Sequence, residues 1–151
     1  MQYSEVSLGR VWVLRLEDGD RLPDTIEQFA RHRNLRQALV FYLGGAGDGS
    51  RLIVGPEKDL DKGIIPTLFT LTGPQEVLAV GTIFTNESDD PILHLHAAVG
   101  REGNATVGCT RAGVDVWLVG EVIMLEIVGG EAQRRRDPKT GFELLEVGPA
   151  Q

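Results

Sequence analysis

Most of the 151-residue chain consists of short segments rich in apolar and β-branched residues, separated by turn-forming residues, which is typical of β-strands. The predicted strands are residues 6–16, 37–43, 51–54, 67–72, 77–85, 92–99, 105–110, 114–128 and 142–147. The run at 37–43 is almost continuously apolar, which predicts a strand buried on both faces. Residues 73–76, Gly-Pro-Gln-Glu, predict a hairpin turn between the strands on either side.

One helix is predicted, after a turn at residues 17–20. The stretch Asp24–Glu27 has the spacing of a capping box, in which the Asp accepts an early helix N–H and the Glu reaches back. The helix then begins at Ile26 and runs to about His32, and Asn34 suits a left-handed end.

The rest of the chain is polar, with a loop at 59–63 and a link at 131–141. It contains no internal repeat, low-complexity tract or domain boundary. We therefore predict one α+β domain over residues 1–151, with its core at about 5–147. The expected architecture is a large, mostly antiparallel mixed sheet with one or two helices.

Glycine is unusually frequent, with 19 residues. Many glycines sit at predicted strand ends, where turns need a positive φ or a close approach of the backbone. Gly81, Gly108 and Gly120 instead lie inside strand patterns, where glycine indicates a bulge, a bend or close contact with another group.

The chain has 22 acidic and 15 basic residues, a net charge of −7. Because nucleic-acid binding needs clustered Lys and Arg to neutralise phosphates, this charge disfavours a DNA partner. The single cysteine excludes an internal disulfide, and the first residues lack the regions of a signal peptide. No apolar run reaches about 18 residues, the length of a membrane span. We therefore expect a cytoplasmic protein without a membrane partner.

The candidate chemistry lies in the predicted strand that contains His94-Leu95-His96. In a strand, residues i and i+2 share a face, so both imidazoles point to the same side. The neighbouring apolar residues, such as Leu93 and Ala97, point to the other side. Two adjacent imidazoles can form half of a metal site, although a His-x-His pattern also arises by chance.

Cys109 is the candidate third ligand. If the following turn is centred between Glu102 and Gly103, the numbers of paired residues add to 205, so His96 faces Cys109. Opposite residues in an antiparallel pair lie about 5 Å apart with side chains on the same face. His94, His96 and Cys109 would then suit one Zn²⁺ per chain, with a fourth position for water or substrate. A slip of one residue would instead make Cys109 a small buried apolar residue on the opposite face.

Other polar residues leave several roles open. Arg15, Asp115, Glu121 and Glu126 lie within strand patterns and could form a buried pair, an intersubunit pair, or a general acid or base beside a metal. The basic run Arg134–Arg136 could contact phosphate, but its polar flanks favour a solvated turn. The glycine-rich stretch at 44–49 lacks a following helix and a Gly-Lys-Ser/Thr motif, which disfavours a nucleotide-binding loop.

Several short motifs accompany His94-Leu95-His96 in a set order along the chain. They are Arg15–Asp20, Leu43–Asp48, Phe69–Gly73, Val107–Cys109, Gly120–Val122 and Arg135–Phe142. With these motifs in this order, the chain resembles the PPC domain family from about Arg10 to Leu145. This plants and prokaryotes domain accompanies AT-hook DNA-binding motifs in plants.

The resemblance implies a compact α+β domain that assembles as a homotrimer. In many bacterial and archaeal members the His-Leu-His pair and a later His bind zinc, and Cys109 stands here in place of that later His. The family also carries a DNA-binding label, although this chain has no Arg-Gly-Arg-type hook.

Three functions remain open. The first is a metal-binding homotrimeric module for assembly, sensing or small-ligand binding. The second is a zinc-dependent hydrolase or lyase for a small molecule, with Glu121, Asp115 or Arg15 as catalytic candidates beside a zinc-bound water. The third is a DNA-binding or regulatory protein, which the net charge of −7 opposes.

Overall fold

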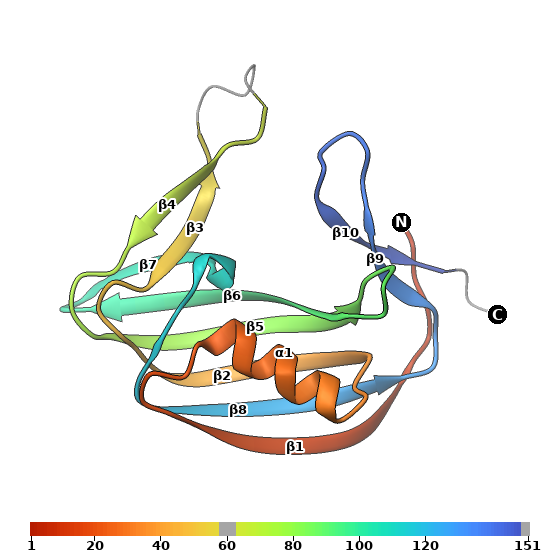
Figure 1. The fold of residues 1–151 in the computed structure, drawn as a ribbon, viewed down its shortest axis with the longest axis horizontal. Coiled ribbons are helices and arrows are strands. Elements are labelled where there is room, and N and C mark those ends of the chain that lie inside the picture. The colour runs from red at the N-terminus through yellow and green to blue at the C-terminus, as the bar shows by residue number, and fades with distance from the viewer. Residues whose placement is uncertain (58–62, 149–151) are drawn as a thin grey trace.

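The protein, seen in a computed structural model, is described over residues 1–57 and 63–148 (Figure 1). The loop predicted at 59–63 therefore lies outside the described residues, apart from Gly63. The elements in chain order are β1 (Ser7–Glu17), α1 (Leu22–His32), β2 (Gln37–Ala46), β3 (Arg51–Pro56), β4 (Pro66–Thr70), β5 (Gln75–Thr85), β6 (Pro91–Arg101), β7 (Asn104–Cys109), the 3₁₀ helix η2 (Thr110–Ala112), β8 (Val116–Val128), β9 (Ala132–Arg136) and β10 (Glu143–Val147).

Eight strands form one sheet in the order β1-β8-β2-β5-β6-β7-β3-β4, and β9 pairs with β10 in a second sheet. The predicted single α+β domain with a large sheet is confirmed. Every strand pair among the described residues is antiparallel, so the expectation of a mixed sheet is wrong. Parallel neighbours need long crossovers that usually contain a helix, and α1 is the one α-helix in the described ranges.

The hairpin predicted at residues 73–76 is also wrong. β4 pairs with β3 at the edge of the sheet, whereas β5 lies between β2 and β6. The segment still turns, because Gly73 has a φ of 68° and its N–H donates to Asp48 Oδ1 at 2.6 Å. A turn-forming sequence bends the chain locally, but the pairing of the two strands depends on which other strands compete for their edges.

Helix α1 begins at Leu22, four residues before the predicted start. Pro23 lies in the first turn, where its missing N–H costs nothing and its fixed φ suits a helix. The predicted capping box is therefore wrong, since Asp24 already lies inside the first turn. Glu27 does not reach back, and its Oε1 accepts a hydrogen bond from the Leu93 N–H at 2.9 Å.

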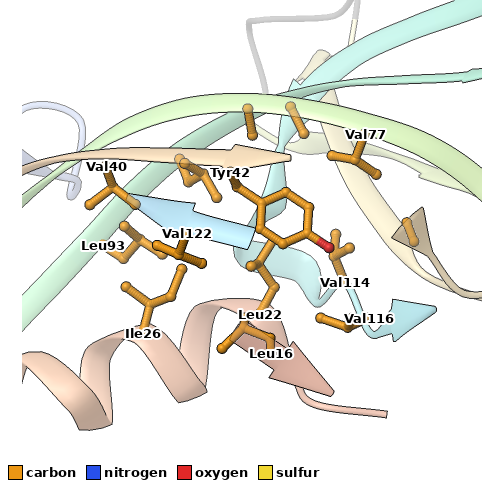
Figure 2. Packing of buried hydrophobic residues seen from close by; sticks show 14 of the residues in the cluster. Leu16, Leu22, Ile26, Val40, Tyr42, Val77, Leu93, Val114, Val116 and Val122 are labelled. Carbon is orange, nitrogen blue, oxygen red and sulfur yellow. The ribbon is translucent and has the colours of Figure 1, made fainter. Parts of the chain in front are cut away.

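The sheet is covered by α1 on one face, and the core lies between them. Figure 2 shows Leu22 and Ile26 of the helix directed at Tyr42, Val122 and other buried side chains of the sheet. The tyrosine hydroxyl donates to the Gly45 carbonyl at 2.8 Å, so its polar end is satisfied inside this apolar layer.

The opposite face of the main sheet is open to solvent over much of its area. In β2, Val40 and Tyr42 are buried, but Phe41 and Leu43 are 40% and 56% exposed. The prediction that this strand is buried on both faces is therefore wrong for a single chain. The alternate residues of this apolar run form an apolar surface on the side of the sheet that α1 does not cover.

The glycines inside strands mark close contacts, as predicted. A Cβ on Gly120 would lie 2.5 Å from the Tyr42 ring, and one on Gly108 would lie 2.7 Å from the Ile53 carbonyl oxygen. A Cβ on Gly81 would overlap the His94 carbonyl oxygen and lie 2.6 Å from Leu95 Cα. At Gly81 both obstacles are backbone atoms of the neighbouring strand.

Among the described residues, no helix has the length and apolar character needed to cross a membrane.

We predict that Gly81→Ala lowers the free energy of unfolding by about 1–3 kcal/mol, because backbone atoms of β6 must shift to admit the methyl group. Denaturant-induced unfolding followed by circular dichroism measures this change. Gly47→Ala is the matched control, since its Cβ would meet only the Asp115 carbonyl oxygen at 3.5 Å. Equal stability of the two variants would contradict the prediction.

Candidate metal centre

The β6–β7 hairpin brings the candidate ligands together. His96 pairs with Cys109, which confirms the predicted register. The turn residues Glu102 and Gly103 have φ values of 53° and 80°, and two positive φ angles are characteristic of a two-residue type I′ turn. The turn geometry therefore fixes which face of β7 carries Cys109.

Strand β6 extends beyond the end of β7, which pairs only as far as Cys109. Two side chains bind the backbone of β6 beyond that point. The Glu27 carboxylate accepts the Leu93 N–H, and the Thr110 hydroxyl donates to the Leu95 carbonyl at 3.2 Å. They hold the backbone on either side of His94, and burial raises the pKa of Glu27 above its ordinary value.

One donor atom from each of His94, His96 and Cys109 lies within 4.8 Å of the other two. The two Nε2 atoms are 3.1 Å apart, and the imidazole rings meet edge to face. Cys109 is 5% exposed and is not in a disulfide. The buried apolar residues of β6 point to the opposite face, as predicted, and they are Leu93, Leu95, Ala97 and Val99.

This donor set fits a metal ion. Ligand bonds of about 2.0–2.3 Å in a tetrahedral arrangement require neighbouring donor atoms about 3.3–3.7 Å apart, which small rotations of these side chains would satisfy. Two imidazole nitrogens and one thiolate favour borderline and soft metals over the hard cations Mg²⁺ and Ca²⁺. The three side chains together could therefore hold one transition-metal ion.

Arg134 is a residue of this region that sequence reasoning missed. The solvated turn predicted for Arg134–Arg136 is wrong, because these residues form β9 and pair with β10. Arg134 is 5% exposed, and its Nη2 donates to Thr82 Oγ1 at 3.2 Å. Its position was not readable from the sequence, because only the return of β9 to the end of β5 buries the first arginine of the run.

The positive charges of Arg134 and Arg111 both act on His94. The pKa of His94 is lowered, first by burial and then by the charges of Arg134, His96 and Arg111. Burial likewise lowers the pKa of Arg134 itself. The donor group therefore lies in locally positive surroundings although the chain as a whole is acidic.

A pocket of about 220 Å³ adjoins the donor group. It lies between the β3–β4 pair and the residues before β10, and both His96 and Cys109 line it. Most of the remaining lining is apolar, and Arg111 contributes the charge. The guanidinium carbon of Arg111 lies 5.4 Å from the centre of the Phe142 ring, a cation–π arrangement.

The three catalytic candidates lie elsewhere. Asp115 pairs with Arg21 at 3.2 Å, and Arg15 contacts Glu17 at 3.3 Å and is the register partner of Glu121. Glu121 is on β8, three strand positions from β6, or about 14 Å at the usual strand spacing. Within one chain, the structure does not bring these residues to the metal-binding group.

The sequence profile of the Plants and Prokaryotes Conserved (PCC) domain matches residues 3–128 of this chain. The chain belongs to this family. The match covers the sheet from before β1 to the end of β8 and includes His94, His96 and Cys109, whereas β9 and β10, with Arg134, follow it.

Three solved structures share this PCC fold. A plant- and prokaryote-conserved (PPC) protein from Pyrococcus horikoshii is 24% identical with a TM-score of 0.80, and the match covers 97% of both chains. A metal-containing protein from Archaeoglobus fulgidus is also 24% identical with a TM-score of 0.80, and the match covers 97% of this chain and 99% of the other. A protein from Ralstonia eutropha named as a candidate DNA-binding protein is 21% identical with a TM-score of 0.68, over 90% of both chains.

Among curated proteins, the PCC chain is 25% identical over 139 residues to the bifunctional protein GlmU of a Synechococcus strain. The alignment covers 91% of this chain but only 20% of GlmU. The chain thus spans about a fifth of the length of this curated relative.

We predict that Arg134→Gln raises the pKa of His94 in the metal-free protein, because loss of a nearby positive charge favours the imidazolium form. Since burial is the larger cause, the pKa should stay below its ordinary value. NMR of the imidazole Cε1 proton against pH measures this. Arg135→Gln is the control, because Arg135 is paired with Glu146 at 3.1 Å. An unchanged His94 titration in Arg134→Gln would show that the charge does not act there.

Proposed function

We propose that this PCC-domain protein is a metal-binding homotrimeric module of the cytoplasm that holds one zinc ion per chain at His94, His96 and Cys109. The observation that carries the proposal is the β6–β7 register, which sets the chain's single cysteine opposite His96 and gathers three donor atoms within 4.8 Å. A reducing compartment suits this assignment, because the cysteine must be a free thiolate to bind the metal.

Zinc is the metal that this donor set favours most. It accepts imidazole nitrogen and thiolate sulfur equally well in four-coordinate sites. The three protein ligands leave a fourth position for water or a small ligand. The metal-containing protein from Archaeoglobus fulgidus, which shares the fold, supports a metal in this family.

The homotrimer is supported by the open face of the main sheet. Across this face, register partners form one row from β1 to β6, and most of its members are exposed apolar residues. The row is Val13, Ile123, Phe41, Val80 and His96. A second row beside it contains Leu43 and Leu78. An exposed apolar surface of this kind marks an interaction site, and two further copies of the same chain are the partners we propose for it.

The other two functions have less support. An enzyme of the hydrolase or lyase type would need an acid or base beside the metal, and no acidic side chain among the described residues belongs to the donor group. A DNA-binding role rests on the names of proteins that share only the fold, and a trimer would carry three times the charge of −7. A small-molecule ligand is therefore the partner we favour, besides the chain itself.

We predict about one zinc per chain in protein purified without chelators, measured by elemental analysis and competition with a chromophoric chelator. Cys109→Ala should weaken zinc binding by more than about 100-fold, because losing a direct ligand weakens metal binding more than losing a residue that only orients a ligand. Cys109→His should restore binding, since imidazole replaces the thiolate. His32→Ala is the control, because His32 is exposed on α1. Zinc-free wild-type protein would refute the assignment.

We predict a mass of three chains by native mass spectrometry or light scattering. Leu78→Glu should give a folded monomer, because Leu78 is 62% exposed in one chain and its carboxylate replacement would be desolvated in the interface. Leu144→Glu, at a 49% exposed apolar residue of β10, should leave the trimer intact. Monomeric wild-type protein would overturn the assembly but not the metal site.

A further inference from the structure

The buried guanidinium of Arg134 has few partners. Its Nη2 donates to Thr82 Oγ1, but its Nε is buried without a hydrogen-bond partner. Among the described residues, no carboxylate lies within the 4.0 Å of an ion pair with it. A buried charge without a partner is costly, so such a group in a folded protein calls for a compensating anion.

Arg134 lies at the metal-binding group and not elsewhere on the sheet. Its hydrogen-bond partner Thr82 is the register partner of His94 on the open face. Cys109 is close enough for its negative charge to act on the guanidinium, as is the exposed Glu143. Arg134 thus approaches the donor group from β9, while Arg111 flanks it from η2.

The charges of this region do not balance once a metal is bound. When a metal is bound, the dication takes up the negative charge of the Cys109 thiolate, so the thiolate does not compensate Arg134. The positive charge of the dication and the two arginines, Arg134 and Arg111, is then larger than the negative charge of the thiolate and Glu143. A net positive, partly buried site of this kind attracts an anion.

The pocket beside the donor group indicates the rest of the ligand. His96, Cys109 and Arg111 line it together with apolar side chains, among them Ile53, Pro56 and Phe142. Its volume of about 220 Å³ suits a short aliphatic group. An inorganic anion would leave this apolar surface unused.

We propose that Arg134 and Arg111 form an anion subsite beside the metal, and that the ligand is a small carboxylic acid whose carboxylate meets these cations while its short apolar chain fills the adjoining pocket. A guanidinium presents two parallel N–H donors that match a carboxylate, which suits Arg134 for this contact. This inference rests on the proposed metal site, because the bound dication leaves Arg134 without an anion.

The test uses the full chain loaded with Co²⁺, a spectroscopic substitute for zinc, after its metal content has been measured. The protein is titrated with 3-methylbutanoate, acetate and inorganic phosphate, and the visible absorption spectrum and thermal stability are recorded. We expect 3-methylbutanoate to change the spectrum and to raise the melting temperature. It should bind at least about tenfold more tightly than acetate, because it buries several additional methyl and methylene groups.

Arg134→Gln should weaken 3-methylbutanoate binding by roughly 10- to 100-fold, the usual effect of losing a hydrogen bond to a charged group, with the metal content unchanged. Arg134→Lys should restore only part of the affinity, because an ammonium lacks the paired donors. Arg135→Gln is the matched control on the same strand and should bind normally. Equal binding by Arg134→Gln and wild type would overturn the role of Arg134.

A comparison of ligands keeps the inference falsifiable if Arg134 variants fail to fold. The uncharged 3-methylbutanamide has nearly the same shape as the acid and should bind at least about tenfold more weakly to the wild type. Equal affinity for acid and amide, or tighter binding of phosphate, would overturn the carboxylate assignment. Protein that binds Co²⁺ without any response to the carboxylate refutes this inference alone, whereas protein that binds no metal refutes the proposed function as well.

Discussion

The candidate site depends on one constraint, the register of the β6–β7 hairpin. Its two turn residues, Glu102 and Gly103, both have positive φ angles, and the tight turn between them leaves a single pairing of the strands. A shift of one residue would turn Cys109 towards the core and leave two histidines alone on the open face. The chemistry of the site therefore depends on backbone geometry six and seven residues away from the cysteine.

The two faces of the main sheet have different roles, and α1 creates the difference. The helix buries the side chains on one face, where Leu93 and Leu95 of β6 anchor the strand in the core. The other face carries His94 and His96 beside exposed apolar residues such as Val80. The alternation of a single strand thus serves both stability and chemistry, and Glu27 links the two by holding the β6 backbone from the helix side.

The charge around the donor group has the opposite sign to that of the whole chain. The net charge of −7 describes the overall surface and opposes binding to phosphate backbones. Near His94, however, Arg134 and Arg111 provide two positive charges, and one of them is buried. The net negative charge of the chain therefore opposes binding to large polyanions, whereas the local positive charge favours binding of small anions. The two conclusions are compatible.

Sequence reasoning predicted the strands of the main sheet, the β6–β7 hairpin and the convergence of His94, His96 and Cys109, because these depend on local periodicity and short turns. It missed β9, whose residues are mostly polar. It misplaced the start of α1. Asp24 and Glu27 have the spacing of a capping box, but Pro23 suits the first turn of a helix that begins earlier, at Leu22. It also wrongly predicted a hairpin at 73–76, because the pairing of β4 and β5 is decided by competition among distant strands.

The sequence by itself determined which residue types share a face, since side-chain alternation in a strand has a period of two. Only the tertiary structure decided that Arg134 is buried beside His94, and that Glu121 and Asp115 lie away from it within one chain. Those outcomes depend on contacts between elements that are far apart in the chain. Local patterns carry no information about such contacts. The contacts arise from the order of strands in the sheet and from the return of β9 to the end of β5.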